Sequence, residues 1–535
     1  MSIGRLVRTV RYLKLRQICF QVWRRVQKAI GPHPKCGDGK LPEFTFLNLT
    51  AKPKGWNDAS LDMLWRYNLH YFDYLNGRVE GSGEVVVGRC SCRKDGDTST
   101  LGLQLKTTTQ SPTTTTHSNL ILQWIAENPK GSIPGWDPYP TSLRIINWIK
   151  WLNNISASSA SLRLCVKQKM EDSLKEQAAY LRSHLEYHLL ANHLLANAKA
   201  LVFAGKYFER KDWYEKGMSI YRKQLPEQIL PDGGHFERSV MYHAIILEDV
   251  LDVVKFCGDG AAWLRPVAEK MLRYLVNMTG PDGKIAMFND AADGIAKSTE
   301  WLVGYAKGLG VETPNAEPFV DFPDTGYTRM MAGDFVLFVD SAPIGPDYQP
   351  GHAHADTLTY ELYYKGRKVV TDVGTSEYRG KRRAYERSTA AHNVVEVGGR
   401  NSSEVWSSHR VGARARIAER KVEPGRIFAA HNGYGFKVAR ELVLTENGLE
   451  VKETVNGRGE CVTRAHVCST AQCVKYTKGE KNAKLLELAI EGLDNIEEFE
   501  YAVEFGKLEK GACLSRSFDG GELCYSIKKD CSPTV

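Results

Sequence analysis

The segment GHAHADTLTYELYYKGRKVVTDVG, residues 351–374, has two histidines one residue apart before an alternating run. The alternation breaks at Lys365-Gly366 and resumes, which predicts two strands joined by a tight turn. Side chains at i and i+2 share a face of an extended chain, so His352 and His354 are expected to point the same way. Asp372, which closes the second strand, could come near them. The sequence therefore predicts a small cluster of imidazole and carboxylate groups at one end of a sheet.

A second group of polar residues interrupts an apolar helical run. In EYHLLANHLLAN, residues 186–197, Asn192 and His193 stand among leucines and alanines. A polar side chain in such a helix must either reach a partner or face a cleft. Bonds to neighbouring loop carbonyls would satisfy these residues equally well, so the pattern by itself leaves both interpretations open.

A third group lies in DGGHFERSVMYH, residues 232–243. The glycine-rich turn is predicted to open a helix that carries Glu237, Arg238 and Tyr242. Arg238 and Tyr242 would then lie four residues apart on one helical face. The alternative is an arginine and a tyrosine that merely pack together on an exposed helix.

These residues require elements that position them, and the chain divides into three predicted parts. Residues 1–43 form a basic amphipathic N-terminal helix and a linker, 44–320 a helical domain, and 321–535 an antiparallel β domain. In the β domain, Asn447-Gly448 between two alternating runs is a strong hairpin signal. Within the helical domain, the Thr-rich stretch at about 79–118 has no buried period, so we expect a disordered surface insertion.

Bulk composition limits the class of protein. A chain of 535 residues is too long for one core, and 42% hydrophobic with 25% charged residues is ordinary for a folded globular protein. The net charge of +8 is modest, so it does not indicate a nucleic-acid partner, although it suits a polyanionic substrate. Twelve cysteines without CxxC spacing indicate neither a zinc ribbon nor a dense disulfide scaffold. Oligomeric state is not indicated.

The N-terminal segment has Arg or Lys every few residues and no uninterrupted apolar run. It is therefore predicted to be neither a secretory signal nor a membrane span, and a cytoplasmic location is expected. Its apolar residues recur at helical spacing between basic ones. Such a helix could lie on an anionic membrane surface, or it could dock its apolar face on the rest of the protein, which is the commoner reason for amphipathic surface helices.

Five motifs, in this order, resemble the heparinase II/III family of polysaccharide lyases: ANHLLANAKAL, DGGHFERSVMYH, GHAHADTLTYEL, DVGTSEY and STAAHNVV. The resemblance runs from about Trp136 to about Arg400. It implies an incomplete (α/α) toroid followed by an antiparallel β-sandwich. The segment WDPYPTSLRIINWIKW also resembles forms without a signal peptide that are similar to broad-specificity glycosaminoglycan and alginate lyases.

The resemblance implies cleavage of 4-linked uronic-acid polysaccharides by β-elimination. Asn192 and His193 would neutralise the substrate carboxylate, while Tyr242 would be the acid and His352 the base. Arg238, Glu237 and Tyr378 are expected to contact the substrate.

The resemblance also implies a structural divalent metal, zinc or else manganese, held by His354, Asp372 and His392. A hydrogen-bonded network without an ion is the alternative. Two other functions stay open: an inverting glycoside hydrolase, for which Asp232 and Glu237 could be offered as carboxylates, and a catalytically silent carbohydrate-binding protein of a polysaccharide assembly pathway.

Overall fold

The computed structural model describes residues 3–30, 41–76, 114–157, 164–468, 483–485 and 488–529. The chain forms two compact units. The larger unit consists of Met1–Phe20, Tyr187–Leu195 and Ile220–Val535, and the smaller of Gln21–Glu186 and Ala196–Ser219. The predicted boundary at 320/321 does not separate them. The last helices before the sheet belong to the sheet's unit, because side chains such as Tyr327, which donates to the Arg238 carbonyl at 2.6 Å, tie them to it.

The smaller unit is mainly helical and has a short hairpin. Buried tryptophans, among them Trp65, Trp124, Trp136 and Trp148, fill its core. Its elements are β1 (Phe44–Phe46), β2 (Leu49–Ala51), α3 (Met63–Tyr71), η1 (Asp73–Asn76), α4 (Thr114–Glu127), α5 (Pro138–Ala157) and α6 (Leu164–Ser183), with parts of α2 (Leu15–Ile30), α7 (Ala191–Tyr207) and α8 (Lys211–Gln228).

Residues 79–113 of the predicted insertion lie outside the described residues. The predicted end at about 118 needs correction. Helix α4 begins at Thr114, so the last five residues of the predicted insertion are helical. Threonine is only a weak helix breaker, and burial of Leu120 and Ile121 anchors the turn that follows.

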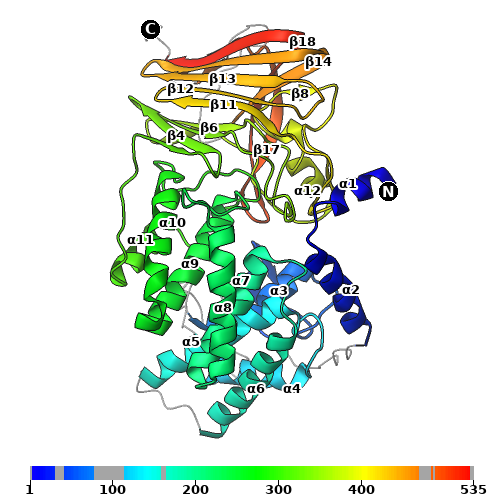
Figure 1. The fold of residues 1–535 in the computed structure, drawn as a ribbon, viewed down its shortest axis with the longest axis vertical. Helices are drawn as coiled ribbons and strands as arrows, with labels where there is room; N and C mark the ends of the chain where they lie inside the picture. The colour runs from blue at the N-terminus through cyan, green and yellow to red at the C-terminus, as the bar shows by residue number, and fades with distance from the viewer. Residues whose placement is uncertain are drawn as a thin grey trace, which may run out of the picture. The chain divides into compact units, whose positions relative to one another are not determined.

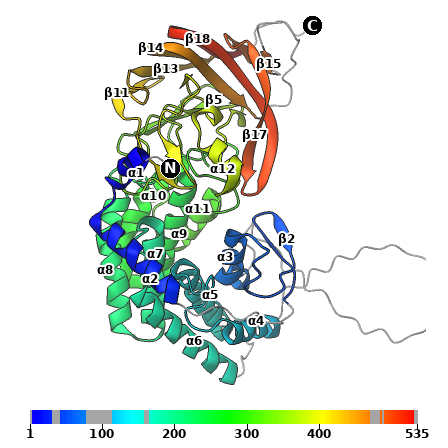
Figure 2. The ribbon, with the colours of Figure 1, turned by 90° about the vertical axis from the view of Figure 1, so that its right-hand side faces the viewer.

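The N-terminal segment forms two helices, α1 (Ile3–Val10) and α2, where a single helix was predicted (Figure 2). The break has a local cause, because the Lys14 backbone N–H donates to the Gln17 side chain at 2.9 Å and α2 starts afresh there. Over the part of the chain that the structure describes, no helix is both long and apolar enough to cross a membrane.

The larger unit places three helices before its sheet. These are α9 (Val240–Cys257), α10 (Arg265–Asn277) and α11 (Thr299–Gly308), with the 3₁₀ segment η2 (Gly258–Leu264). Ser239 caps α9, since its hydroxyl accepts from the Tyr242 backbone N–H at 3.2 Å. Helix α9 therefore starts after Glu237 and Arg238, which corrects the prediction that both lie on this helix with Tyr242.

One large antiparallel sheet makes up the β region, in the order β11-β12-β13-β14-β7-β6-β5-β4-β3. It folds into two layers, with β11 to β14 and β18 above β4 and β6 in Figure 1. Residues of both layers, among them Leu337, Leu362, Leu442 and Val451, share one apolar core. The strands on this path are β3 (Phe319–Phe322), β4 (Tyr327–Ala332), β5 (Phe335–Asp340), β6 (Tyr360–Tyr364), β7 (Arg367–Val370), β11 (Ile417–Glu423), β12 (Arg426–His431), β13 (Val438–Thr445) and β14 (Gly448–Val467).

The remaining strands pair beside this path or form a separate hairpin. They are β8 (Glu396–Val397), β9 (Val405–Trp406), β10 (Arg410–Val411), β15 (Ala483–Leu485), β16 (Leu488–Glu491), β17 (Asn495–Glu504) and β18 (Lys507–Lys529). Both predicted hairpins are confirmed: β6 and β7 join at Lys365-Gly366, and Thr445 pairs with Gly448 across the other turn.

The loops at the end of β6 and β7 are held by buried polar groups. Asn393 donates to the Tyr360 and Thr371 carbonyls at 2.8 and 2.9 Å. In the chain, Asn393 follows α12 (Gly380–Glu386) and η3 (Thr389–Ala391) and precedes β8. A fully bonded buried network of this kind fixes backbone positions, so the loops that carry His352, His354 and His392 have a rigid support.

Candidate active site

His352 and His354 lie in the loop before β6, and one carboxylate serves both. Asp290 accepts from His352 Nδ1 at 2.8 Å through Oδ2 and from His354 Nε2 at 2.7 Å through Oδ1. The prediction that the two rings lie on one side of the chain agrees with this arrangement, although neither residue belongs to the strand. Because an ionised carboxylate only accepts, His352 Nδ1 carries a proton, so that in the neutral ring Nε2 is the nitrogen with the lone pair.

Asp290 is fully buried and ionised. Burial by itself favours the neutral acid, but Arg383 and the two histidines outweigh it and hold the pKa of Asp290 well below its usual range. The Arg383 guanidinium on α12 binds both carboxylate oxygens, the second at 2.8 Å through Nη2. The pair is bidentate and therefore fixes the carboxylate in place.

Tyr242, in the first turn of α9, packs on His352. The two ring centroids are 3.8 Å apart and the rings are tilted by 28°. The Tyr242 hydroxyl lies 2.8 Å from that of Tyr378, which follows β7. Burial and the negative charge of Asp290 raise the pKa of Tyr378 above its usual value. The structure thus joins three predicted residues, each from a different segment, into a pair of hydroxyls beside an imidazole.

Asn192 and His193 start a helix and do not lie within one. Leu190 and Ala191 have φ of 62° and 46°, which ends the preceding loop and begins α7 at Ala191. The first-turn N–H groups of a helix are the positive end of its dipole. Asn192 is buried and His193 half-buried at this end, which is a favourable place for a carboxylate.

Glu237 lies beside His352 and beside the start of α7. Its Oε1 is 3.8 Å from His352 Nε2, and its side chain is buried. Burial raises the pKa of Glu237, and interactions with His352, His193 and the Asn192 backbone N–H oppose this shift only in part. A neutral carboxyl next to an imidazole can donate a hydrogen bond to an anion.

Arg238 was predicted to contact the substrate, and its side chain is committed elsewhere. Its guanidinium donates to the carbonyls of Thr325 at 2.8 Å and of Phe236 and Asp324 at 3.3 Å. Its backbone has a φ of 58°, so the residue turns the chain ahead of α9. Arg238 therefore supports the turn that presents Glu237, and the predicted pairing with Tyr242 on one helical face is wrong.

A second cluster lies on the buried side of His354. His354, Asp356 and His392 each offer one ligand atom within 4.8 Å of the others, and all three are buried. His354 Nδ1, Asp356 Oδ2 and His392 Nε2 have no hydrogen-bond partner among the described residues. Burial raises the pKa of Asp356 to about 6. Two imidazoles and a carboxylate with unpaired buried atoms fit a divalent metal of the zinc type.

Asp372, a predicted ligand, holds a different position. Its Oδ1 accepts from His392 Nδ1 at 2.8 Å, and its Oδ2 accepts from Thr359 at 2.8 Å. It thus orients the ring of His392 from behind, as carboxylates commonly do for metal-binding histidines. The grouping of ligand atoms therefore favours Asp356 over the predicted Asp372 beside the two imidazoles, and the metal itself stays a prediction.

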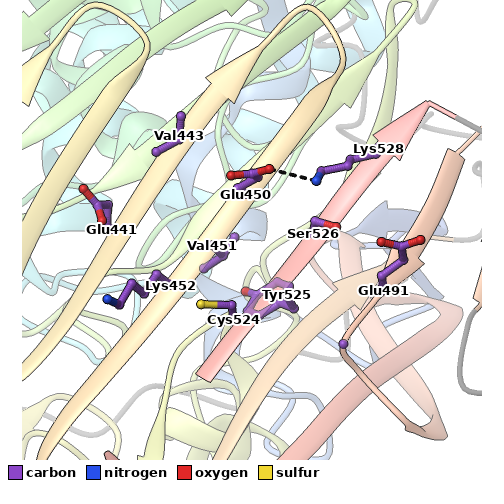
Figure 3. Close-up of a pocket in the computed structure, with 11 residues that line it drawn as sticks. Glu441, Val443, Glu450, Val451, Lys452, Glu491, Cys524, Tyr525, Ser526 and Lys528 are labelled. Carbon is purple, nitrogen blue, oxygen red and sulfur yellow. Dashed lines mark ion pairs between the residues drawn. The ribbon is translucent and has the colours of Figure 1, made fainter. Parts of the chain in front are cut away.

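A hollow of about 440 Å³ lies on the outer layer of the sheet, among β13, β14, β16 and β18 (Figure 3). Three glutamates and two lysines line it, and one pair, Glu450 and Lys528, is already joined at 2.8 Å. The negative balance does not suit a polyanion. None of the predicted site residues is among its lining.

No pattern among their sequence neighbours marks Asp290 or Arg383 as functional residues. Asp356 had one, because it continues the i, i+2 series of His352 and His354. His409, on the β9–β10 turn, was also missed; its ring centroid is 6.2 Å from that of His352 and 5.6 Å from that of Tyr378.

Two family models match the chain. Residues 102–307 match the heparinase II/III N-terminus, and residues 314–516 match the heparinase II/III-like C-terminal domain. The chain belongs to the heparinase II/III family. Every residue of the two clusters described above lies within these matched ranges.

Curated relatives are heparin-sulfate lyases. The chain is 24% identical to that of Bacteroides stercoris over 255 residues, 41% of this chain and 38% of that protein. It is 24% identical to that of Pedobacter heparinus over 316 residues, 52% of this chain and 47% of that protein. The chain thus spans about half or less of the length of these relatives.

Solved structures of the family share the fold. The crystal structure of heparinase III aligns with a TM-score of 0.64 at 18% identity, covering 78% of this chain and 73% of that one. A heparan sulfate lyase from Pedobacter heparinus aligns with a TM-score of 0.56 at 16% identity, covering 96% and 88%.

Proposed function

We propose that this chain is a polysaccharide lyase that cleaves 4-linked uronic-acid polysaccharides of the glycosaminoglycan type by β-elimination. The observation that carries the proposal is the Tyr242 hydroxyl, bonded to Tyr378 at 2.8 Å and beside a His352 ring whose Nδ1 is bonded to Asp290, so that Nε2 is the nitrogen left to act on a substrate. This arrangement supplies an acid and a base at one point. The heparin-sulfate lyase relatives support the same reaction.

The first requirement of the reaction is neutralisation of the uronate carboxylate, whose charge makes the neighbouring C5 proton very weakly acidic. We assign this to Asn192 and His193 at the start of α7 and to the protonated form of the Glu237 carboxyl, which burial favours. Each donor aimed at the developing enediolate can stabilise it by roughly 3 kcal/mol. The positive end of the α7 dipole acts in the same direction.

Elimination then breaks the C5–H and C4–O4 bonds and forms a C4=C5 double bond. The C5 proton passes to His352 Nε2 or to a deprotonated Tyr242, and O4 leaves with a proton from Tyr242. Tyr378, bonded to Tyr242, can stabilise the tyrosinate that this transfer leaves. Each transfer is worth roughly 10²–10⁴-fold.

Substrate stereochemistry decides which residue is the base. In glucuronate or mannuronate, the C5 proton and O4 lie on the same side, so Tyr242 can serve as base and then as acid. In the C5 epimers, iduronate and guluronate, they lie on opposite sides, and His352 becomes necessary. One site could therefore accept both epimers, including alginate-like chains.

We also propose a structural divalent metal, zinc by donor type, held by His354, Asp356 and His392 with Asp372 behind His392. When bound, the metal would crosslink the loop before β6 to the segment around η3. The metal would act on the proposed catalytic residues through Asp290. A fixed His354 ring would hold the Asp290 carboxylate in place, and that carboxylate orients His352.

The helices before the sheet are proposed to be part of an incomplete (α/α) toroid, as in the family, with the two-layered sheet as its β-sandwich. A cytoplasmic location remains the expectation from the basic N-terminal segment.

The hydrolase alternative loses its second carboxylate. Asp232 accepts from the Thr325 backbone N–H at 2.6 Å, the Thr325 hydroxyl at 2.8 Å and the Gly234 N–H at 3.1 Å. Those bonds shape the turn before Glu237 and leave the carboxylate little freedom to activate water. Inverting hydrolysis needs two free carboxylates across a cleft.

Incubation with heparan sulfate, heparin, hyaluronan, chondroitin sulfate and alginate tests the proposal. A lyase produces the ultraviolet absorbance of a 4,5-unsaturated uronate on at least one of them. New reducing ends without that absorbance would indicate a hydrolase. Binding without either product would indicate a silent carbohydrate-binding protein.

A further inference from the structure

The N-terminal helices face the protein with their polar sides. On α1, Arg8 binds both oxygens of Glu404 at 2.8 and 2.9 Å, and Thr9 accepts from the Trp406 indole at 3.1 Å. Arg5 binds Glu404 at 2.9 Å. The sequence left open whether the apolar face docks on the protein or lies on a membrane; these polar contacts are made by the opposite face.

Part of the apolar side of α1 is left in solvent, while its Leu6 and Val10 are half-buried. Ile3 is 82% exposed and Val7 is 59% exposed, one helical turn apart. A helix that merely docks would bury these two residues and expose its arginines. In the arrangement observed, apolar side chains lie in solvent, where a surface helix normally has polar ones.

Helix α2 repeats the arrangement. Its Gln17 is buried and donates to the Tyr348 carbonyl at 3.2 Å. Leu15, Ile18 and Val22 share the other face at i, i+3 and i+7, and all three are exposed, Leu15 to 75%. Trp23, next to this row, is 54% exposed. Tryptophan at the edge of an apolar face is typical of membrane interfaces.

Charge identifies the surface that these side chains fit. Residues 1–30 contain no acidic residue and eight basic ones: Arg5, Arg8, Arg11, Lys14, Arg16, Arg24, Arg25 and Lys28. Arg11, Arg16 and Arg25 are exposed beside the apolar rows. An apolar row flanked by cations complements an anionic bilayer, whose headgroups attract arginine while its acyl boundary takes up the apolar side chains.

We propose that α1 and the start of α2 bind the surface of an anionic lipid bilayer, with Ile3, Val7, Leu15, Ile18 and Val22 inserted at its interface. The contact is peripheral and reversible. The pairing of the α1 arginines with Glu404 is consistent with this contact, because it turns the apolar row outward. The proposal does not depend on the reaction that the enzyme catalyses.

Co-sedimentation of the full chain with vesicles tests the proposal. Wild-type protein should bind vesicles of phosphatidylcholine containing about a third phosphatidylserine at least tenfold more tightly than pure phosphatidylcholine. Raised salt should weaken this binding, because surface charges are screened. The triple variant Ile3→Ser/Val7→Ser/Leu15→Ser should lose at least tenfold in affinity with little change in melting temperature or in activity on dissolved substrate.

The matched control changes three exposed apolar residues elsewhere, Trp301→Ser/Met331→Ser/Leu508→Ser. It should bind as wild type does. Equal loss in both triple variants, or no binding of wild type to the anionic vesicles, would overturn the proposal. So would a wild-type dimer in light scattering that the first triple variant abolishes, since the apolar rows would then cover a second copy of the chain.

Discussion

The two histidines of one short motif lie in opposite surroundings. His352 is partly open, 11% exposed; its ring stacks on Tyr242, and its Nε2 lies 3.8 Å from Glu237 Oε1. His354 is fully buried, and its unpaired nitrogen faces Asp356 and His392. Each donates one ring N–H to Asp290. One carboxylate thus couples a group suited to proton transfer with a group suited to metal binding.

The difference shows how identical side chains acquire different chemistry. An imidazole that is itself partly open to solvent can gain and lose a proton during turnover. An imidazole in a dry cluster of ligand atoms cannot take up a proton cheaply; accordingly, burial lowers the pKa of His354 to about 3 despite its bond to Asp290. Variants on the two sides of Asp290 should therefore fail in different ways.

Tyr242→Phe should have the largest effect, on the open side. It removes the transferable proton and keeps the ring packed on His352, so kcat should fall by at least roughly 10³-fold with substrate binding nearly intact. Production of unsaturated uronate and binding by calorimetry measure the two effects. Tyr348→Phe, which removes a hydroxyl that donates to Glu227 at 2.7 Å, is the matched control. Unchanged turnover in Tyr242→Phe would remove this residue from the mechanism.

His352→Ala and His354→Ala should separate the two sides. His352→Ala should keep the metal and the fold and lose roughly 10²-fold or more in activity on iduronate- or guluronate-containing chains, with a smaller loss on glucuronate or mannuronate. His354→Ala should lose the metal and lower the melting temperature, with activity reduced alike on both epimers.

Elemental analysis of both purified variants, melting curves and rates on two epimeric substrates provide the comparison. Equal metal loss in the two variants would mean that His352 is a ligand too. Full metal content in His354→Ala would favour a hydrogen-bonded network without an ion.

Asp356→Asn and Asp372→Asn should sharpen the description of the buried side. If Asp356 is a ligand and Asp372 orients His392, Asp356→Asn should purify without the metal. Asp372→Asn should retain it with affinity lowered roughly 10- to 100-fold. Titration with a competing chelator measures both. The reverse order of affinities would restore Asp372 as the ligand.

Glu237→Gln should have the smallest effect, visible in the pH profile of kcat/KM. Because burial raises the pKa of Glu237, the folded chain holds this proton more tightly than the unfolded chain does. Its favourable contribution to stability is therefore present at low pH and is lost as the pH rises through the raised pKa. Ionised Glu237 would also repel the uronate, so wild-type activity should fall in that range.

The glutamine variant keeps a neutral donor at this position. Its activity should stay within a few-fold of wild type at low pH and decline less on the alkaline side. Superimposable profiles would show that Glu237 does not titrate in the productive complex. Glu227→Gln, in α8, is a suitable control because the Glu227 carboxylate is bonded to Tyr348 and Lys14.

Sequence alone determined the order of helical and β regions, the two hairpin turns and the residues with catalytic potential. These depend on local properties: apolar period, turn chemistry at Lys365-Gly366 and Asn447-Gly448, and polar residues within apolar runs. The five motifs also identified the family. For the same reason, His352, Tyr242 and Tyr378 could be named before their contacts were known.

Only the tertiary structure decided which side chains have free atoms. Arg238 has a group that could bind a substrate, but its guanidinium donates to three backbone carbonyls. Asp372 has a group that could bind a metal, but its carboxylate accepts from His392 and Thr359. Asp290 gains its role from histidines 62 and more residues away in the sequence. Asp356 gains its role from the buried space that it shares with His354 and His392. On α1, the same amphipathic pattern fits either orientation, and Glu404 selects the one that exposes Ile3 and Val7. Hydrogen-bond partners distant in sequence are set by packing, which no local pattern encodes.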